Sequence, residues 1–472
     1  MQTRFSAEKT KQDLAADAAS TLPHAFTTTK HHKDPVKHRH VAAAGAAAST
    51  RVSQAINQAL TALMPDLHAM WRRTLSTLPA RRYCPRRQAA KHAAVRDMTY
   101  KCWITTNSHE VRQMLEALNR DATQAYHSSR DKHGRRRTFR RTAKWGVYDF
   151  TTLYTTLPHS HPVHGLKQRM GQLILDAFNR HGNEWLILRK WGEPSWRRGV
   201  PGNQGQVLPP QAQVGETVVG PDTLTKWINQ LLDHCYLAFG GQIWRQVVGI
   251  PMGEACSGML ANFYLYSYEL QFMRRLMAAR RWALAERFLY TRRYIDDIGS
   301  FNNNKFAARR YLQAGKIGIY PSQYLTLNEE QAPKHGPGRL LDLYITTDDK
   351  CCRYRSNAIT TDQDTRPRAG MRFPAVDTLL ADRSKYGIVT AEAVRYQRGS
   401  MQEHRFVQLM ADMVSDMAQR GYDMHKVANK TSGAVAQGSL AYRGGGARLT
   451  REVWRQVADK LQRRAAAQRG AR

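Results

Sequence analysis

The sequence predicts a mixed α+β fold, because short strand-and-turn segments that carry acidic residues are combined with apolar helical segments. From Phe288 to Phe301, aromatic and β-branched residues flank an acidic pair, which indicates two short strands joined by a turn. From Ala255 to Glu269, apolar residues repeat on all sides, which predicts a buried helix. A chain of 472 residues can hold two or three subdomains and bury a large core.

The first 50 residues are predicted to form a disordered basic tail. They contain few large apolar residues, and residues 42–48 are alanine apart from one glycine. The histidines of residues 31–40 (His31, His32, His38 and His40) could suggest a metal site, but lysines and Pro35 interrupt them, which argues against a closed metal site. We therefore expect the tail to contribute positive charge and no folded core.

Two amphipathic helices are expected after the tail. Apolar residues recur at helical spacing from Ile56 to Leu78 and again over residues 109–119. Between residues 130 and 144 the chain is dominated by Lys and Arg, and Asp131 is the only acid. Such a strip is usually a solvated surface, but this one directly precedes the first acidic strand.

Three carboxylates are placed at the ends of predicted strands. Lys144 to Tyr154 is typical of a strand that runs into a turn, with Asp149 at the strand's end, and Asp296 and Asp297 occupy the later turn. Like charges this close are costly unless a divalent cation neutralises them. Mg²⁺ is the usual choice, with Mn²⁺ as the alternative, because it is a hard cation that prefers oxygen ligands. A third carboxylate from a neighbouring strand is what a two-metal phosphoryl-transfer site requires.

The interval between these carboxylates holds three further predicted features. Residues 196–222 are rich in Gly, Pro and Gln, which favours an inserted loop, and Leu224 to Phe239 is expected to be a helix. In Gln246 to Gly253, two glycines and a proline would keep the backbone close to something flat. At the C-terminus, a basic amphipathic helix carries an apolar stripe that includes Val453 and Val457, which we expect to pack within the molecule.

Taken in order, the three segments DFTTLYTTLPH, RQVVGIPMGEACSGMLANFYLYSYE and RYIDDI resemble motifs A, B and C of a reverse transcriptase palm. The wording is most similar to the Penelope-like and telomerase-like branch. Tyr320 to Asn328 and Leu340 to Leu343 resemble the next palm elements, and Tyr386 to Ile388 and Gly421-Tyr422 resemble parts of the helical thumb. The resemblance covers roughly residues 145 to 425.

The resemblance implies a right-hand polymerase with fingers, an antiparallel palm sheet and a helical thumb. The boundaries that we expect are a disordered tail at 1–50, partial fingers at 51–144, a palm at 145–350 with the inserted loop 196–222, a thumb at 351–440 and a basic C-terminal helix at 441–472.

The activity that the resemblance implies is RNA-directed DNA polymerisation for a retroelement. The substrates would be an RNA template, a DNA primer and deoxynucleoside triphosphates, and the primer 3′-hydroxyl would attack the α-phosphate. Asp149 and Asp296 would bridge two Mg²⁺ ions, and Asp297 would be a weaker ligand.

The resemblance also assigns residues to the nucleotide. Phe150 would offer its backbone N–H to the triphosphate, and Met252 and Gly253 would lie under the nucleotide and the template base. Tyr154 would be a gate whose ring collides with a ribose 2′-hydroxyl and so selects deoxynucleotides. The alternative for Tyr154 is a core aromatic residue.

Contacts to the nucleic acid backbone are expected at two places. One is the cationic strip before the first acidic strand, and the other is the thumb. The residues are Arg135, Arg136, Arg137, Arg140 and Arg141 in the strip, and Arg395, Tyr396 and Arg398 in the thumb.

The bulk composition agrees with a nucleic-acid partner inside the cell. Lys and Arg number 72 against 38 Asp and Glu, a net charge of +34 that favours binding to a polyanion. The six cysteines are scattered without a CxxC pair, which indicates reduced thiols. The chain has no run of about 20 apolar residues and no secretory signal, so we expect no membrane contact and a nuclear or cytoplasmic location.

Two alternatives stay open. No stretch between residues 66 and 144 matches the lysine and arginine with which the family's fingers grip the triphosphate, Arg87 and Lys101 being the nearest candidates. A decayed or domesticated palm-fold protein that binds nucleic acid without polymerising is therefore the alternative function. An RNA-dependent RNA polymerase is disfavoured by Tyr154 and by the Tyr-Ile-Asp-Asp form of the acidic turn.

Overall fold

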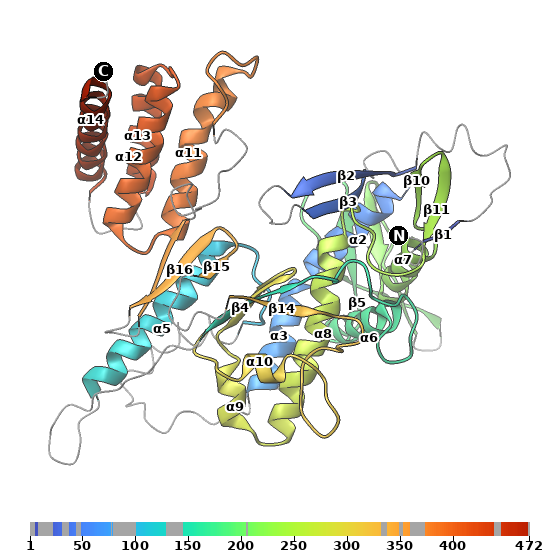
Figure 1. Ribbon diagram of the computed structural model, residues 1–472. Coiled ribbons are helices and arrows are strands. Elements are labelled where there is room, and N and C mark those ends of the chain that lie inside the picture. The colour runs from blue at the N-terminus through green and yellow to red at the C-terminus, as the bar shows by residue number, and fades with distance from the viewer. Residues whose placement is uncertain are drawn as a thin grey trace, which may run out of the picture. The chain divides into compact units, whose positions relative to one another are not determined.

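The computed structural model contains two compact units, each described separately (Figure 1). The structure describes residues 5–7, 22–30, 37–43, 49–76, 78, 101–128, 145–203, 206–331, 338–348, 353–358, 373–438 and 445–470. Unit 1 consists of the described residues of 1–30, 35–104 and 144–331, and unit 2 of those of 105–143 and 332–472.

The centre of unit 1 is a four-stranded antiparallel sheet with the order β12-β13-β4-β14. The strands are β4 (Gly146–Phe150), β12 (Thr291–Tyr294), β13 (Asp297–Ser300) and β14 (Leu327–Gln331). The two predicted strands around the acidic pair are confirmed, as is the position of Asp149 at the end of its strand.

One face of this sheet packs on helix α8 (Ser257–Ala278). Tyr148 and Phe150 of β4, Ile298 of β13 and Leu327 of β14 all point to this face and are buried in the same apolar core as α8. The prediction of a buried helix is confirmed, since most positions of α8 are buried around its whole circumference. The opposite face of the sheet carries Asp149 between the buried residues of β4, as strand alternation requires.

The N-terminal helical segment packs on the same core as two helices and not as one. Helix α2 (Thr50–Ala62) ends at Leu63, and α3 (Met64–Leu75) begins with a proline in its first turn. Proline at this position cannot continue the preceding helix but suits the start of a new one. The Tyr266 hydroxyl of α8 donates to the Leu67 carbonyl of α3 at 2.6 Å, which ties the two elements together.

The predicted loop 196–222 is wrong, because much of it is paired strand. The elements are β5 (Glu184–Arg189), β6 (Ser195–Arg198), β7 (Val200–Pro201), β8 (Val207–Leu208) and β9 (Glu216–Val219). β6 and β9 flank β5 on its two sides, and the buried Leu186 and Leu188 of β5 hold this small sheet on the core. The pairing of these strands overrides the loop preference of the local Gly and Pro content.

Helices α6 (Leu166–Phe178) and α7 (Pro221–Asp233) cover the same core, and α7 ends earlier than predicted. The residues up to Phe239 form β10 (Tyr236–Phe239), which pairs with β11 (Gln242–Gln246). Gly240 and Gly241 join them with φ values of 61° and 73°, which is the backbone of a type I′ hairpin turn.

The predicted disordered tail also needs correction. The strands β1 (Phe5–Ala7), β2 (His24–Lys30) and β3 (Lys37–Ala43) join β10 and β11 in a five-stranded sheet. All seven residues of β2 pair with β3, and His24 pairs with Ala238 of β10. Threonines 27–29 are β-branched and favour an extended backbone once a strand partner is present.

Unit 2 is mainly helical. Its helices are α5 (Ser108–Ser128), α11 (Asp382–Gly399), α12 (Glu403–Gln419), α13 (Met424–Gly438) and α14 (Gly446–Gly470). The predicted C-terminal helix is confirmed, because Val453 and Val457 are buried in the core that α12 also forms. None of the helices in the described ranges is both long and apolar enough to cross a bilayer.

The unit boundaries differ from the predicted fingers and palm. The predicted fingers 51–144 are divided, with α2 and α3 in unit 1 and α5 in unit 2. The strands β15 (Gly338–Leu340) and β16 (Leu343–Asp348), which fall in the predicted palm, belong to unit 2 together with β17 (Arg353–Ala358), which falls in the predicted thumb. Their place follows from two hydrogen bonds of 2.7 and 2.8 Å between Asn119 of α5 and the Tyr354 backbone of β17.

Some predictions lie outside the described residues. These are the cationic strip with Arg135, Arg136, Arg137, Arg140 and Arg141, and the fingers candidate Arg87. Among the described cysteines, Cys102, Cys235 and Cys256 are free thiols, as predicted. Burial raises the pKa of Cys102 to about 12, so this thiol stays protonated.

Candidate active site

The acidic turn is a two-residue connection with an unusual backbone. Tyr294 of β12 pairs with Asp297 of β13, so Ile295 and Asp296 form the turn itself. Ile295 has a φ of 51°, and Asp296 does not share the positive φ, which is the pattern of a type II′ turn. A β-branched residue in this region costs on the order of 1–3 kcal/mol and persists only where the surroundings hold it.

The register of the sheet brings the carboxylates into one row. Asp297 lies directly opposite Asp149, and Asp149 lies directly opposite Asn328 on its other side. Tyr294 extends the row on the far side of Asp297. Direct partners in an antiparallel ladder have Cα atoms about 4.5–5.5 Å apart. The four side chains therefore share the face of the sheet that is turned away from the core. We call them the carboxylate row.

Asp296 is docked beside this row by a main-chain hydrogen bond. The Phe150 N–H donates to the Asp296 carbonyl at 3.2 Å, and the Thr151 N–H donates to the Thr326 carbonyl at 3.1 Å. The Phe150 ring is 4% exposed and belongs to the core. The Phe150 N–H, the predicted donor to the triphosphate, thus holds the acidic turn in place in this structure, and its role toward the nucleotide stays a prediction.

The glycine-containing segment before α8 is clipped to the backbone that follows β4. The N–H groups of Gly249 and Ile250 donate to the carbonyls of Leu157 and Tyr154 at 2.7 and 3.0 Å. Gly249 has a φ of 88°, and a Cβ there would lie 2.4 Å from the Tyr154 carbonyl oxygen. The glycines predicted a close approach of the backbone to a flat group. At Gly249 that group is the peptide bond after Tyr154.

His159 completes this clip. Its Nε2 donates to the Gly249 carbonyl at 2.7 Å, and burial lowers the pKa of the ring below its usual value. A neutral imidazole can donate here without bringing a charge into the core. Beyond the clip, Met252 is half-buried, and Gly253 is exposed with a φ of 107°.

Tyr154 lies between the two roles that the sequence left open. Its side chain is half-buried and packs against the core of unit 1. Its carbonyl is fixed by Ile250, so the position of its backbone relative to β4 is set by the clip. The gate assignment stays a prediction.

In the thumb segment, the three predicted nucleic-acid contacts differ in their surroundings. Tyr396 is 0% exposed inside the helical core of unit 2, so the prediction of a backbone contact by its ring is wrong. Arg395 is held by Glu392, with a shortest N–O distance of 2.6 Å. Arg398 is exposed.

The donor set fits an open magnesium site. Among the residues that the structure describes, no three His, Cys, Asp or Glu side chains are gathered into a complete metal cluster. Mg²⁺ in phosphoryl-transfer proteins is commonly held by one or two carboxylates and completes its octahedron with water and substrate phosphates. Asp149 and Asp297, which face each other as half-buried side chains at the turn end of the sheet, offer the two oxygen donors that such a site needs.

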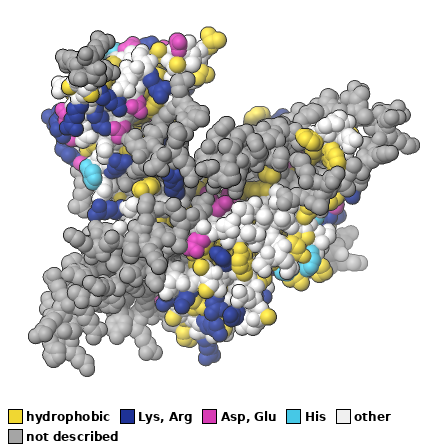
Figure 2. All heavy atoms as spheres, viewed as in Figure 1, with side chains coloured by type: hydrophobic (Ala, Val, Ile, Leu, Met, Phe, Trp, Pro, Cys, Tyr) yellow, Lys and Arg dark blue, Asp and Glu magenta, His cyan; other side chains and the backbone are white. Residues whose placement is uncertain are grey.

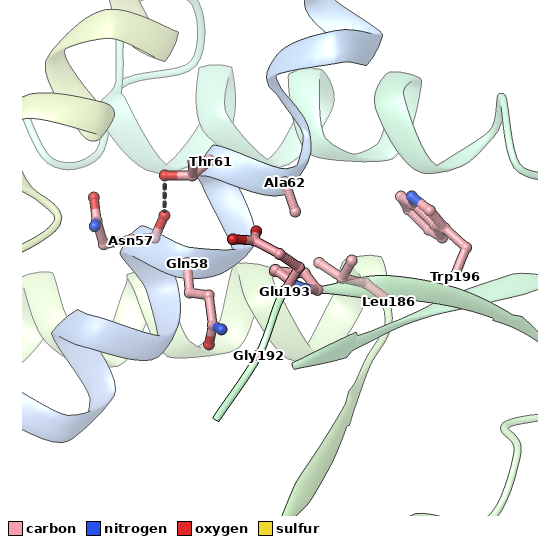
Figure 3. Close-up of a pocket in the computed structure, with 9 residues that line it drawn as sticks. Asn57, Gln58, Thr61, Ala62, Leu186, Gly192, Glu193 and Trp196 are labelled. Carbon is pink, nitrogen blue, oxygen red and sulfur yellow. Dashed lines mark hydrogen bonds between the residues drawn. The ribbon is translucent and has the colours of Figure 1, made fainter. Parts of the chain in front are cut away.

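A pocket of about 430 Å³ lies elsewhere in unit 1, between α2 and the strands β5 and β6 (Figure 3). Asn57, Gln58 and Thr61 of α2 line one side, and Leu186 and Trp196 line the other. None of its lining residues belongs to the carboxylate row. The pocket has no pair of carboxylates, whereas Asp149 and Asp297 of the row lie opposite each other.

The sequence reasoning did not identify two members of the row. Tyr294 belongs to the predicted acidic motif and Asn328 to the predicted next palm element, and the sequence pattern marks neither as a site residue. The signal was strand alternation: Asn328 follows the buried Leu327, so it had to face away from the core once β14 was paired with β4.

No protein-family model matches the chain, and no curated protein matches it either. Among solved structures, the telomerase of Candida albicans in complex with a TWJ fragment of telomeric RNA aligns over 97% of this chain, with a TM-score of 0.54 and 8% sequence identity. The chain spans 64% of the length of that telomerase. The 3Dpol RNA-dependent RNA polymerase of a sicinivirus aligns over 72% of this chain and 54% of its own at 11% identity, but its TM-score of 0.25 supports no argument. The predicted fold class is confirmed: the chain has the α+β fold of a right-hand polymerase.

Proposed function

We propose that the chain is an RNA-directed DNA polymerase of a Penelope-like or related retroelement. The observation that carries this proposal is the carboxylate row, in which Asp149 and Asp297 face each other on the side of the central sheet that is turned away from α8, with Asp296 in the adjoining turn. The telomerase-like fold supports the same conclusion, because telomerase is a reverse transcriptase.

In this proposal each part of the site has one task. Asp149, Asp296 and Asp297 would hold Mg²⁺ together with substrate phosphates, and the metal would supply activation of the primer 3′-hydroxyl and neutralisation of the leaving pyrophosphate. The sheet register fixes the spacing of the carboxylates, so positioning is complete before the substrate arrives. The Gly249 clip fixes the backbone of Tyr154, whose ring would exclude the ribose 2′-hydroxyl.

The surface of unit 1 supports a nucleic-acid partner. Figure 2 shows Lys and Arg side chains gathered at the lower edge of the view, where α8 ends and α9 (Trp282–Arg287) lies. The exposed cations there are Arg274, Arg275, Arg280, Arg281 and Arg287. Together with the net charge of +34, they favour binding that weakens steeply as salt is added.

Primer extension with Mg²⁺ tests the proposal. The assay would compare RNA with DNA as template and deoxynucleotides with ribonucleotides as substrate, using the full chain. We expect deoxynucleotide incorporation on the RNA template. If wild type extends no better than Asp296→Ala while still binding the duplex, the chain is the nucleic-acid-binding alternative. If ribonucleotides are preferred on RNA, it is an RNA-dependent RNA polymerase.

A further inference from the structure

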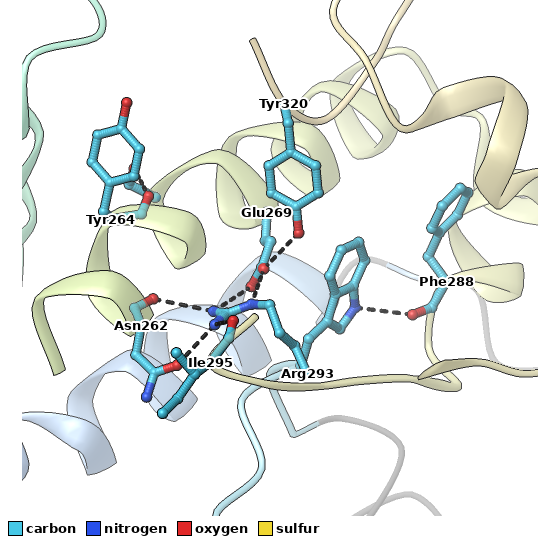
Figure 4. Close-up of polar contacts among 9 residues, drawn as sticks. Asn262, Tyr264, Glu269, Phe288, Arg293, Ile295 and Tyr320 are labelled. Carbon is cyan, nitrogen blue, oxygen red and sulfur yellow. Dashed lines mark hydrogen bonds and ion pairs between the residues drawn. The ribbon is translucent and has the colours of Figure 1, made fainter. Parts of the chain in front are cut away.

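A fully buried ion pair lies directly beneath the acidic turn (Figure 4). Arg293 of β12 and Glu269 of α8 are both 0% exposed, with 2.5 Å between Nε and Oε1 and 3.3 Å between Nη2 and Oε2. Arg293 pairs with Ile298 in the hairpin, so its side chain points to the core face of the sheet and not to the carboxylate row.

All five N–H donors of the Arg293 guanidinium have an acceptor. Besides the two bonds to Glu269, Nη1 donates to Asn262 Oδ1 at 2.8 Å and Nη2 donates to the Asn262 carbonyl at 3.1 Å. The remaining bond runs from Nη1 to the Ile295 carbonyl at 3.1 Å. An arginine could neutralise the charge of Glu269 without the bond to the Ile295 carbonyl. That bond is the one through which Arg293 reaches the acidic turn.

The contact at Ile295 falls where the backbone needs support. Ile295 has the positive φ of 51°, and its carbonyl begins the peptide bond that leads into Asp296. The Ile295 side chain packs against the core that α8 forms, and a Cβ on Gly258 of α8 would lie 3.6 Å from Ile295 Cδ1, which is ordinary packing distance. The strained residue is thus held from its carbonyl by Arg293 and from its side chain by α8.

The ion pair is itself anchored from several elements. The Tyr320 hydroxyl donates to Glu269 Oε1 at 2.8 Å, and the Arg293 N–H donates to the Trp103 carbonyl at 2.6 Å. Burial and the neighbouring Glu269 charge raise the pKa of Tyr320 well above its ordinary value, so its hydroxyl remains a donor at neutral pH. Burial alone would lower the pKa of Arg293, but the Glu269 charge raises it overall, so the guanidinium stays charged.

We propose that Arg293 is a positioning residue that, fixed by Glu269 and Asn262, holds the strained Ile295-Asp296 turn in the conformation that presents the carboxylates to the metal. This deepens the proposed function and rests on it for the metal. The competing account is a buried ion pair that only stabilises the core. The two accounts differ in what the loss of the Ile295 contact does to Asp296.

The test compares Arg293→Lys with Tyr320→Phe. Arg293→Lys keeps a positive charge beside Glu269 but loses the planar fork that reaches Ile295. Tyr320→Phe removes one hydrogen bond from the same carboxylate and leaves the Ile295 contact in place, so it is the matched control for damage to the core.

Two readouts follow the turn without turnover. Hydrogen exchange at the Phe150 amide reports whether Asp296 stays docked on β4, because that amide donates to the Asp296 carbonyl. Electron paramagnetic resonance measures Mn²⁺ affinity for the full chain with a primer–template duplex and a non-hydrolysable deoxynucleotide analogue. We expect Arg293→Lys to speed the exchange and to weaken Mn²⁺ binding by about tenfold or more, as loss of an outer-shell partner does. Tyr320→Phe should change neither.

Asn262→Ala carries the same test if Arg293→Lys does not fold, since it preserves the ion pair and removes the acceptor that orients Nη1. Smaller changes in the same direction are expected. Unchanged exchange and Mn²⁺ affinity in a folded variant, or an equal change in Tyr320→Phe, would overturn the proposal. Failure of the proposed function looks different: wild type would bind Mn²⁺ no better than Asp296→Ala, while exchange at Phe150 would still respond to Arg293→Lys.

Discussion

At the scale of single residues, Tyr154 separates a catalytic role from a packing role most sharply. If its ring stands under the sugar of the incoming nucleotide, Tyr154→Val removes the clash with a 2′-hydroxyl. One such clash is worth a few kcal/mol, so ribonucleotide incorporation should rise relative to deoxynucleotide incorporation on the order of a hundredfold. Single-nucleotide extension with each substrate measures the ratio.

Tyr324→Val is the control for this substitution, because Tyr324 is also half-buried against the same core. Truncating an aromatic residue that only packs costs roughly 3–5 kcal/mol when it is fully buried and less when it is half-buried. Both substrates would then be affected alike. A Tyr154→Val enzyme with unchanged selectivity and a lowered melting temperature would show that Tyr154 is a core residue.

Gly249 gives a second prediction at this scale, on stability. Gly249→Ala places a methyl group 2.4 Å from the Tyr154 carbonyl oxygen at a φ of 88°, so the clip must open or the backbone must carry strain of about 1–3 kcal/mol. The matched control is Gly171→Ala in α6, where the added Cβ would meet Thr225 at an ordinary 3.5 Å and should stabilise the helix by about 0.5–1 kcal/mol. Thermal unfolding of both variants checks the opposite signs. Equal effects would mean that the close approach at Gly249 does not constrain the fold.

The candidate residues show which roles a sequence can indicate. Asp149 and Asp297 were predictable as neighbours, because each stands at a strand end and the strands had to pair. The surroundings of Phe150 and Tyr396 were not predictable. The acceptor of the Phe150 N–H and the helices that cover the Tyr396 ring are set by the tertiary structure. Arg293 was missed for the same reason. One acceptor, Asn262 of α8, is 31 residues away in the sequence. Another is the main-chain carbonyl of Ile295, whose apolar side chain gives no sign of a polar contact.

At the scale of elements, the clip between the segment after β4 and the segment before α8 makes unit 1 sensitive to acid. Burial lowers the pKa of His159, so the folded state disfavours its protonation, while the unfolded state takes up a proton below about 6.5. The contribution to stability is complete above about pH 6.5 and is lost as the pH falls through the window below it.

His159→Gln tests this prediction, because a glutamine amide can donate to the Gly249 carbonyl but does not titrate. Melting temperatures at about pH 8 and about pH 5.5 should differ less in the variant than in wild type. Some pH dependence should remain, since burial also lowers the pKa of His164. An identical pH dependence in the two proteins would exclude His159 as a contributor.

The elements that the sequence mispredicted were strands that are defined by their pairing with another strand and not by their own composition. The residues of β6 and β9 become strands by pairing with β5, and β2 does so by pairing with β3 and β10. Local composition favoured loop or disorder in both cases. The helical segments were predicted well, because their periodicity is local, and the division between α2 and α3 could have been read from Pro65.

At the scale of the whole molecule, the fold class could be predicted because three motifs in fixed order imply one sheet. The division into units could not. It depends on whether a strand pairs with the central sheet or packs on α5 and α11. The strand β17 packs on these helices: Asn119 of α5 bonds to its Tyr354 backbone, and its Ser356 hydroxyl donates to the Gly399 carbonyl of α11 at 2.8 Å. Neither contact has a local signature.

The central claim is that the carboxylate row performs metal-dependent polymerisation, and primer extension by Asp149→Ala and Asp297→Ala tests it most directly. Asp222→Ala, an exposed carboxylate in the first turn of α7, is the control. Loss of a metal ligand removes several kcal/mol of charge stabilisation, so extension should fall roughly a thousandfold. The melting temperature should not fall, because directly opposed like charges destabilise a sheet. Extension that persists within about tenfold of wild type, or that falls only together with stability, would contradict the account.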